Sequence, residues 1–254
     1  DSSTSRGLGD VYKRQGQLCQ YRKADGTDQT WAGVDDWRPA GEYRDKAEEL
    51  EPRAQASLYF YGVNPKNNTG NSRWDLYQNW QLEYKWQDGC AKNIKFWYEA
   101  GSREWFEFPI YRMAEFYLNI AEAYNEEGNP TMALRYLNDI RRRGGIPDET
   151  QTDRVGLRRS IHREWAVEFY VENQWYPHAR HWKQGASMVG GAKYKFEFSQ
   201  AAGVSWNPRK PEEFANYTRK PSYVPEYTWH ERMSLSPFTL SEVNKGYLVQ
   251  NPGY

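Results

Sequence analysis

Apolar positions with helical spacing stand out in the middle of the chain. One stripe recurs at intervals of four and three residues and is formed by Ile110, Ala114, Tyr117, Ala121 and Tyr124. These intervals place the five side chains on one face of an amphipathic helix. Pro109 suits the first turn of this helix, and Gly128 suits the position after its last turn.

A second apolar stripe follows directly and is formed by Ala133, Leu137 and Ile140. Asn129-Pro130 supplies an N-cap and a first-turn proline, and Gly144-Gly145 ends the pattern. The two stripes predict an αα-hairpin. The order of large and small residues also matches the offsets of a tetratricopeptide repeat, a unit that needs helical neighbours to bury its faces.

A third helix is expected over about residues 153–171. Its apolar residues recur at every fourth position and are Leu157, Ile161, Trp165 and Phe169. Asn173 marks the end of this helix, because Asn tolerates a left-handed backbone. A short helical continuation is expected over residues 175–182.

The rest of the chain shows little sustained periodicity. Residues 16–105 are interrupted by Gly, Pro, Asn and Asp, with short candidate strands at 58–61 and 94–98. Residues 186–254 are again rich in Gly, Pro and aromatic residues. We therefore predict a mainly α fold, in which a tetratricopeptide-like superhelix over residues 106–185 lies between two long irregular, aromatic-rich segments.

The start of the chain has no initiator Met and no apolar signal segment. Residues 1–15 resemble translated adapter sequence, and we interpret them as a non-native scar. We expect the N-terminal part of the natural protein to be missing. No stretch approaches the roughly 18 apolar residues that span a bilayer.

Charge and composition narrow the function classes. Lys and Arg number 34, as do Asp and Glu, so the formal net charge is zero. This balance argues against nucleic-acid binding, which calls for a basic excess. Aromatic residues make up 17% of the chain, yet the mean hydropathy is −1.03. The rings fit either a core poor in aliphatic residues or partly wet platforms for sugar rings.

Three carboxylates share one face of the third predicted helix: Glu164, Glu168 and Glu172. Acid–base cleavage of a glycosidic bond needs two carboxyl groups that face each other across the substrate. Carboxylates on a single helix face do not meet this requirement. We therefore expect them to form ion pairs with Arg158, Arg159 and the run of arginines at 141–143.

No sequence motif indicates a metal, a cofactor or a catalytic residue. His178 and His181 lie three residues apart, but a metal site needs further donors, and no Cys or third His is near in sequence. Cys19 and Cys90 form one disulfide or remain two free thiols. We expect no catalytic residue, no metal and no cofactor.

Three blocks of sequence resemble the SusD/RagB family. The first contains Arg112-Met113-Ala114-Glu115 and Ala121-Glu122-Ala123, the second contains Ile161-His162-Arg163-Glu164, and the third is the terminal run Gln250-Asn251-Pro252-Gly253-Tyr254. All three occur in the order that the family shows. The resemblance covers about residues 95–254.

The chain departs from the family pattern in the second block. The family usually has Arg at Trp165, Trp175 and His181, Gly at Asn173, and Asp at His178. In the family these positions resemble an ion-pair network that ties helices together. We therefore expect the fold to be kept with altered packing.

The resemblance implies a non-catalytic protein that binds an oligosaccharide or polysaccharide for nutrient uptake. It implies a lipoprotein on the outer surface of a Bacteroidota-type outer membrane, with a lipid anchor that is absent from this fragment. It also implies a SusC-like TonB-dependent transporter as partner, which receives the glycan. Nucleic acid is not among the implied partners.

The family motifs do not carry the glycan contacts, so these are predicted from aromatic residues with polar neighbours in residues 16–105. The candidates are Trp31, Trp37, Trp74, Tyr77, Trp80, Asn71, Arg73 and Asp75. The rings between Trp74 and Trp86 also have the spacing of a buried stripe on an amphipathic helix. Both interpretations stay open for that segment.

Two other functions compete with glycan capture. A helical glycoside hydrolase would use paired carboxylates in an aromatic cleft. A tetratricopeptide scaffold would bind a peptide, but it would show further repeats at a period of about 34 residues, and the sequence shows none.

Overall fold

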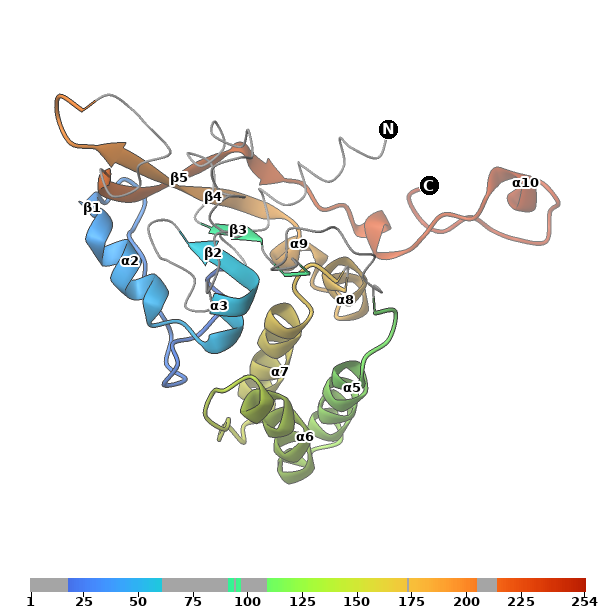
Figure 1. Ribbon diagram of the computed structural model, residues 1–254. Helices are drawn as coiled ribbons and strands as arrows, with labels where there is room; N and C mark the ends of the chain where they lie inside the picture. Colours follow the sequence, from blue (N-terminus) through green and yellow to red (C-terminus); the bar gives the residue numbers. More distant parts are fainter. Residues whose placement is uncertain (1–17, 61–90, 94, 97–108, 173, 205–213) are drawn as a thin grey trace.

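The computed structural model describes residues 18–60, 91–93, 95–96, 109–172, 174–204 and 214–254 (Figure 1). The helices are α2 (Ala40–Glu48), α3 (Pro52–Ser57), α5 (Met113–Glu126), α6 (Pro130–Arg143), α7 (Arg154–Glu168), α8 (Trp175–His181), α9 (Gly185–Met188), α10 (Leu240–Val243) and the 3-10 helix η3 (Glu231–Ser234). The strands are β1 (Arg38–Pro39), β2 (Leu58–Phe60), β3 (Ala91–Asn93), β4 (Gly191–Gln200) and β5 (Phe214–Tyr227).

The predicted αα-hairpin is confirmed as helices α5 and α6. Gly128 has a φ of +82° after the last turn of α5, a conformation that favours glycine. Asn129 caps α6 by accepting a hydrogen bond from the Met132 N–H, and Pro130 occupies its first turn. The cap and turn residues therefore fix where one helix ends and the next begins.

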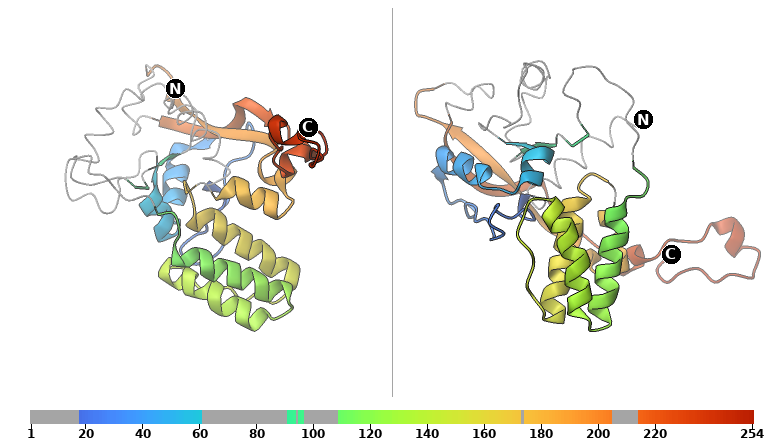
Figure 2. Two further views of the ribbon diagram at one scale, coloured as in Figure 1. Left: turned by 90° about the vertical axis from the view of Figure 1, so that its right-hand side faces the viewer. Right: turned by 60° about the horizontal axis from the view of Figure 1, so that its bottom comes forward.

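Helix α7 packs beside the hairpin, as two views show (Figures 1 and 2). Its N-cap Asp153 accepts from the Gly156 N–H. The three helices bury a common core of Ala114, Leu118, Ala121, Ala133, Leu137, Ile140, Leu157, Ile161, Trp165 and Phe169. The predicted stripes thus supply nearly all of this core, and the predicted third helix and its continuation in α8 are confirmed.

The prediction for the start of the first helix is wrong. Helix α5 begins at Met113, and Ile110 is 77% exposed instead of lying on the buried stripe. The backbone of Arg112 is extended, with φ −130° and ψ 150°. From this position the Arg112 guanidinium donates to Glu168 and Glu172 at the end of α7.

Strands β4 and β5 correct the prediction that residues 186–254 are irregular. They pair antiparallel over most of their length, and β1 joins β5 to give the order β1-β5-β4. Phe196 and Phe198 alternate with polar residues in β4 and are buried, as expected for a half-buried strand. Strands β2 and β3 form a separate antiparallel pair, which confirms the candidate strand near residue 58.

A second core lies between the three-stranded sheet and the segment 18–60. Helices α2 and α3 belong to this segment, so it is less irregular than predicted. Tyr43 of α2 packs its ring against Phe196, Phe198 and Tyr217 of the sheet at centroid distances of 5.1 to 5.9 Å. Helix α7 joins the two cores, because its end contributes Val167 to this one.

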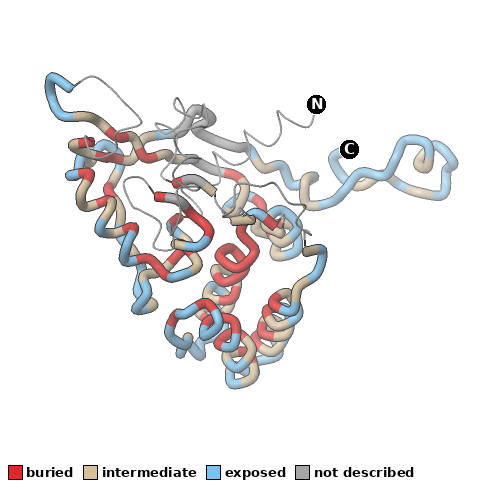
Figure 3. Tube along the Cα trace, viewed as in Figure 1, coloured by how far each residue is buried: buried red, intermediate tan, exposed pale blue. Residues whose placement is uncertain are grey.

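The C-terminal segment after β5 extends away from the body of the protein (Figure 1) and is mostly exposed (Figure 3). It is held in shape by its own hydrogen bonds. The Gln250 side chain bonds both the N–H and the carbonyl of Phe238, and the Asn251 amide donates to the Ser236 carbonyl. The terminal run that resembles the family motif therefore closes this segment on itself.

No helix among the described residues is long and apolar enough to cross a membrane. Cys19 is a free thiol, and Cys90 lies outside the described residues. The proposed scar at residues 1–15 also lies outside them.

Candidate functional site

A buried cluster of charges joins helix α7 to the segments around it. Glu164 and Glu168 lie one turn apart on α7, and Glu172 follows in the turn after the helix, where Val171 has a φ of +65°. All three carboxylates are buried. Charged groups at such depth need paired, hydrogen-bonded partners.

The first partner comes from helix α3. Arg53 donates to Glu164 and, at 3.3 Å, to Glu168, while its Nε donates to Glu51 at 2.8 Å. Gly144 makes room for it, because a Cβ there would lie 2.6 Å from the Arg53 Nε. A glycine after α6 therefore allows the guanidinium of α3 to reach α7.

The second group of partners comes from segments before α5. Arg112 donates through Nη1 to Glu168 at 2.7 Å and through Nε and Nη2 to the two oxygens of Glu172 at 2.7 and 2.9 Å. Lys95 donates to Glu172 at 2.6 Å and to the Glu168 carbonyl at 2.9 Å. These bonds tie residues that are far apart in sequence to the end of α7.

The prediction of ion pairs for the glutamates is confirmed in part. Arg141 lies 3.6 Å from Glu164, and Arg143 donates to Glu168, as the sequence suggested. Arg158, however, pairs with Glu126 of α5. Sequence reasoning missed Arg53, Lys95 and Arg112, because only the tertiary fold brings them to α7. It also placed Glu172 on the helix, which ends at Glu168.

The ion pairs determine the charge state of the cluster. Burial opposes ionisation of Glu168, but hydrogen bonds and charges of Arg112 and Arg143 outweigh it and lower its pKa to about 2. Burial lowers the pKa of Lys95, although Glu172 opposes the shift. The Glu168 carboxylate is therefore ionised throughout the physiological range and acts as a fixed acceptor.

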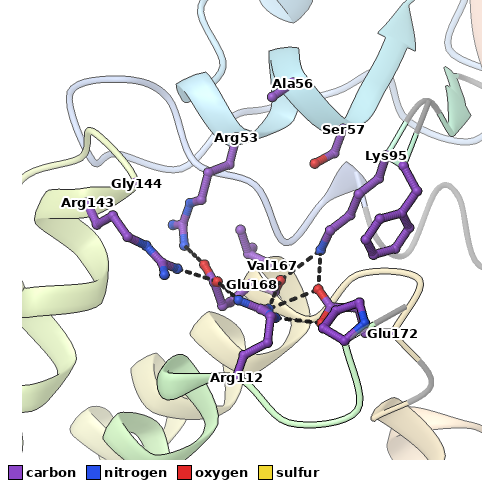
Figure 4. Close-up of a pocket in the computed structure, with 12 residues that line it drawn as sticks. Arg53, Ala56, Ser57, Lys95, Arg112, Arg143, Gly144, Val167, Glu168 and Glu172 are labelled. Atoms are coloured by element: carbon purple, nitrogen blue, oxygen red, sulfur yellow. Dashed lines mark hydrogen bonds and ion pairs between the residues drawn. The ribbon is translucent and has the colours of Figure 1, made fainter. Parts of the chain in front are cut away.

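The cluster lines a cavity of about 350 Å³ (Figure 4). Its walls come from α3, the residues after β3, the segment before α5, the end of α6 and the end of α7. The lining residues are Arg53, Ala56, Ser57, Lys95, Phe96, Pro109, Arg112, Arg143, Gly144, Val167, Glu168 and Glu172. The cavity thus combines charged, hydroxyl and apolar surfaces.

A stack of rings lies at the other side of α7. His162 stacks on Trp182 at 3.6 Å between centroids, and His178 contacts Trp182 at 4.7 Å and Trp165 at 3.9 Å. Burial is the main cause that lowers the pKa of His162 and of His178 to about 4. Both imidazoles are therefore neutral near pH 7, and the rings of the two histidines pack as aromatic surfaces.

The candidate metal pair does not form a site. The ring centroids of His178 and His181 lie 6.3 Å apart and nearly perpendicular. No group of three or more His, Cys, Asp or Glu side chains in the described part of the chain could hold a metal ion. His178 is instead engaged in the ring stack.

Two of the predicted glycan contacts lie within the described residues. Trp31 packs against Tyr43 and Phe196 at 5.6 Å and belongs largely to the second core. Trp37 is 43% exposed, and the Lys220 ammonium lies 5.9 Å from its ring centroid. The remaining six candidates, Asn71, Arg73, Trp74, Asp75, Tyr77 and Trp80, lie outside the described residues.

Charged residues lie near Trp37 in sequence and, in the case of Lys220, in space. Arg38 donates to both carboxylate oxygens of Asp36 at 3.0 and 2.9 Å, and Lys220 pairs with Asp35. Asp35 has a φ of +58°, which Asp tolerates better than most residues. Trp37 is thus an exposed ring that has Asp36 and Arg38 beside it in sequence and the Lys220 ammonium near its face.

Comparison with known proteins gives the family. The model of the SusD family matches residues 1–254, which is the whole chain. The chain belongs to the SusD family. A search of curated proteins finds no match.

Solved structures agree with this assignment. A SusD-like protein from Bacteroides fragilis has 27% sequence identity and a TM-score of 0.65, with 95% of this chain and 46% of that chain covered. A protein named BT4246 has 25% identity and a TM-score of 0.63, with 95% and 44% covered. The present SusD-family chain thus spans about half the length of the structures that it matches.

The ring stack includes two positions at which the resemblance to the family led us to expect other residues. Arg was expected at Trp165 and Asp at His178. Here the two side chains meet as rings at 3.9 Å. The observed contact between Trp165 and His178 is therefore aromatic, where the family resemblance led us to expect an ion pair.

Proposed function

We propose that this chain binds an oligosaccharide or polysaccharide at the outer surface of the outer membrane and presents it to a SusC-like TonB-dependent transporter, without cleaving it. The observation that carries the proposal is the match of the SusD family to the whole chain. A lipid anchor outside the present sequence would hold the protein at the membrane. The transporter and the anchor are expectations drawn from the family resemblance.

The exposed Trp37 supports a binding role. Its ring is accessible on the sheet side of the molecule, beside Asp35, Asp36 and Lys220. The apolar face of a sugar ring can stack on indole while its hydroxyls bond the flanking charged groups. We propose Trp37 as one glycan contact, and the six undescribed candidates remain proposals on sequence grounds.

The carboxylates argue against the hydrolase. A general acid needs a raised pKa, whereas the pKa of Glu168 is lowered to about 2. Burial raises the pKa of Glu122, but this residue accepts a hydrogen bond from the Trp182 indole at 2.8 Å and does not line the cavity. The glutamates of α7 therefore serve the fold.

The contribution of Trp37 can be measured directly. Once a bound glycan has been found, we expect Trp37→Ala to weaken its affinity by about tenfold or more, because truncation of an aromatic anchor costs roughly 1.4 kcal/mol or more. Tyr176→Ala is the matched control, since Tyr176 is 42% exposed, close to the 43% of Trp37. Equal affinities of the two variants and the parent would remove Trp37 from the site.

A further inference from the structure

The cavity at the end of α7 and the ion pairs behind its wall together carry one more positive than negative charge among the described residues. Arg53, Lys95, Arg112 and Arg143 line it with Glu168 and Glu172. The partners behind its wall are Arg141, Glu51 and Glu164. Five cations and four carboxylates make up this cluster, so one positive charge is left without a counterpart.

The hydrogen bonds of the arginines indicate that the unbalanced positive charge lies on Arg143. All three guanidinium nitrogens of Arg112 are engaged by Glu168 and Glu172. Arg143 bonds Glu168 through Nη2 alone, and its Nε and Nη1 have no partner in the described part of the chain. The Arg143 side chain is also 54% exposed, far more than the 23% of Arg112. Arg143 therefore has donors to offer to an incoming anion.

The uncharged residues that line the cavity offer hydroxyl, apolar and aromatic surfaces that suit a sugar unit. Ser57 is a buried residue that brings a hydroxyl to the cavity wall, and Pro109 and Val167 add apolar surface. Phe96 brings a ring to the wall from a backbone with φ +66°, an unusual conformation for a bulky residue. Strained residues of this kind concentrate at ligand clamps. A volume of about 350 Å³ is at the lower end of the range for small-ligand pockets.

We propose that this cavity binds a carboxylate-bearing sugar, a hexuronic acid unit of an acidic glycan, with its carboxylate on Arg143. The planar guanidinium fork matches a carboxylate in a bidentate pair. The added negative charge balances the cluster, and Phe96 and Ser57 face the rest of the ring. This inference rests on the proposed glycan-binding function and specifies its substrate class.

The test is calorimetric titration of the purified chain with trigalacturonate and with its fully methyl-esterified form, which keeps the shape and removes the charge. We expect the acid to bind at least about tenfold more tightly, because hydrogen bonds to charged groups are worth roughly that factor. Its affinity falls as salt rises, because Arg143 is partly exposed.

Two arginine variants test whether the preference for the acid comes from Arg143. Arg143→Gln should reduce the affinity for trigalacturonate at least about tenfold and leave the affinity for the ester unchanged. Arg142→Gln is the matched control: Arg142 is the preceding residue, similarly exposed, and pairs with Asp139 and Asp148 away from the cavity. Thermal melts of both variants check that the fold is kept, which we expect because Glu168 retains Arg53 and Arg112 in either case.

Each contrary result has a distinct meaning. Equal affinities for the acid and the ester overturn the uronate assignment and leave glycan binding intact. An equal loss of affinity for trigalacturonate in Arg143→Gln and Arg142→Gln has the same meaning. A sulfated neutral trisaccharide that binds as tightly as the acid overturns the preference for a carboxylate. If neither trigalacturonate nor any neutral glycan binds, the proposed function fails with it.

Discussion

Glu168 is the acceptor on which three segments of the chain converge. It receives hydrogen bonds from Arg53, Arg112 and Arg143 while it is itself buried. The removal of one partner from a buried ion pair leaves uncompensated charge, which costs far more than an exposed pair contributes. The stability of the contact between α3, α5, α6 and α7 therefore depends strongly on this one side chain.

We expect Glu168→Gln to lower the free energy of unfolding by about 3 kcal/mol. Asp139→Asn removes one of the two exposed partners of Arg142 and should change the free energy of unfolding by less than about 0.5 kcal/mol. Urea titrations of both variants provide the measurement. A loss in Glu168→Gln no larger than that in Asp139→Asn would show that the cluster does not stabilise the fold.

The two partly buried histidines of the ring stack make the free energy of unfolding depend on pH at values above those at which the carboxylates titrate. His162 and His178 have a pKa of about 4 in the folded chain and an ordinary value of 6.5 when unfolded. Between these values the unfolded state binds more protons, so the free energy of unfolding falls as the pH falls from 6.5 to 4. Glu168, with its pKa lowered from 4.5 to about 2, adds a loss only below about pH 4.5.

A variant with His162→Phe and His178→Phe keeps two rings in the stack and removes both titrations. We expect its urea midpoint to stay nearly constant between pH 7 and 5, while that of the parent decreases. His230→Phe, on the exposed C-terminal segment, should keep the slope of the parent. An unchanged slope in the double variant would assign the pH dependence to other groups.

Residue roles were only partly predictable from the sequence. The glutamates of α7 were predicted as ion-pair members because their spacing is local. Arg53 and Lys95 were not predicted, since no sequence signal tells which distant cation reaches a buried carboxylate. The sequence predicted both Trp31 and Trp37 as glycan contacts, and the packing of Tyr43 and Phe196 separates the partly buried ring of Trp31 from the exposed ring of Trp37.

At the scale of elements, the helical hairpin is specified by its turn. Gly128, Asn129 and Pro130 end α5 and start α6 by three separate local effects. The apolar stripes then bury the facing sides of both helices. Because each of these signals is local and periodic, the sequence predicted this part of the fold well.

The N-cap can be tested alone. We expect Asn129→Ala to lower the free energy of unfolding by about 1 kcal/mol, because it removes the acceptor of the Met132 N–H. Asn129→Ser keeps an N-cap oxygen and should cost a few tenths of a kcal/mol at most. Denaturant unfolding followed by circular dichroism measures both, and equal losses would contradict the capping role.

The strands were harder to predict. In β4 the alternation of Tyr194, Phe196 and Phe198 with polar residues is visible in the sequence. The glycines before this stretch and the prolines of the partner strand nevertheless led to the prediction of an irregular segment. In β5 the pairing with β4 shifts near Ser199, so no simple alternation extends along both strands. Pairing across an intervening segment is a tertiary property that single-strand patterns describe poorly.

At the scale of the whole molecule, the chain corresponds to about half of the SusD-like structures that it matches, which it covers to 46% and 44%. The helical hairpin leaves Met113 and Phe116 exposed on α5, and the C-terminal segment leaves Leu240 and Val249 exposed. The sequence predicted the family from its motifs. It did not predict the position of the C-terminal segment, which lies away from the body (Figure 1).

The central claim is that this chain captures a glycan without cleaving it. The most direct measurement incubates the purified protein with a panel of soluble and insoluble polysaccharides and scores retention and released reducing ends in the same samples. We predict retention on at least one glycan with no release of reducing ends. Release that disappears when carboxylates are replaced would contradict the account and identify a hydrolase, and retention on no glycan would contradict it as well.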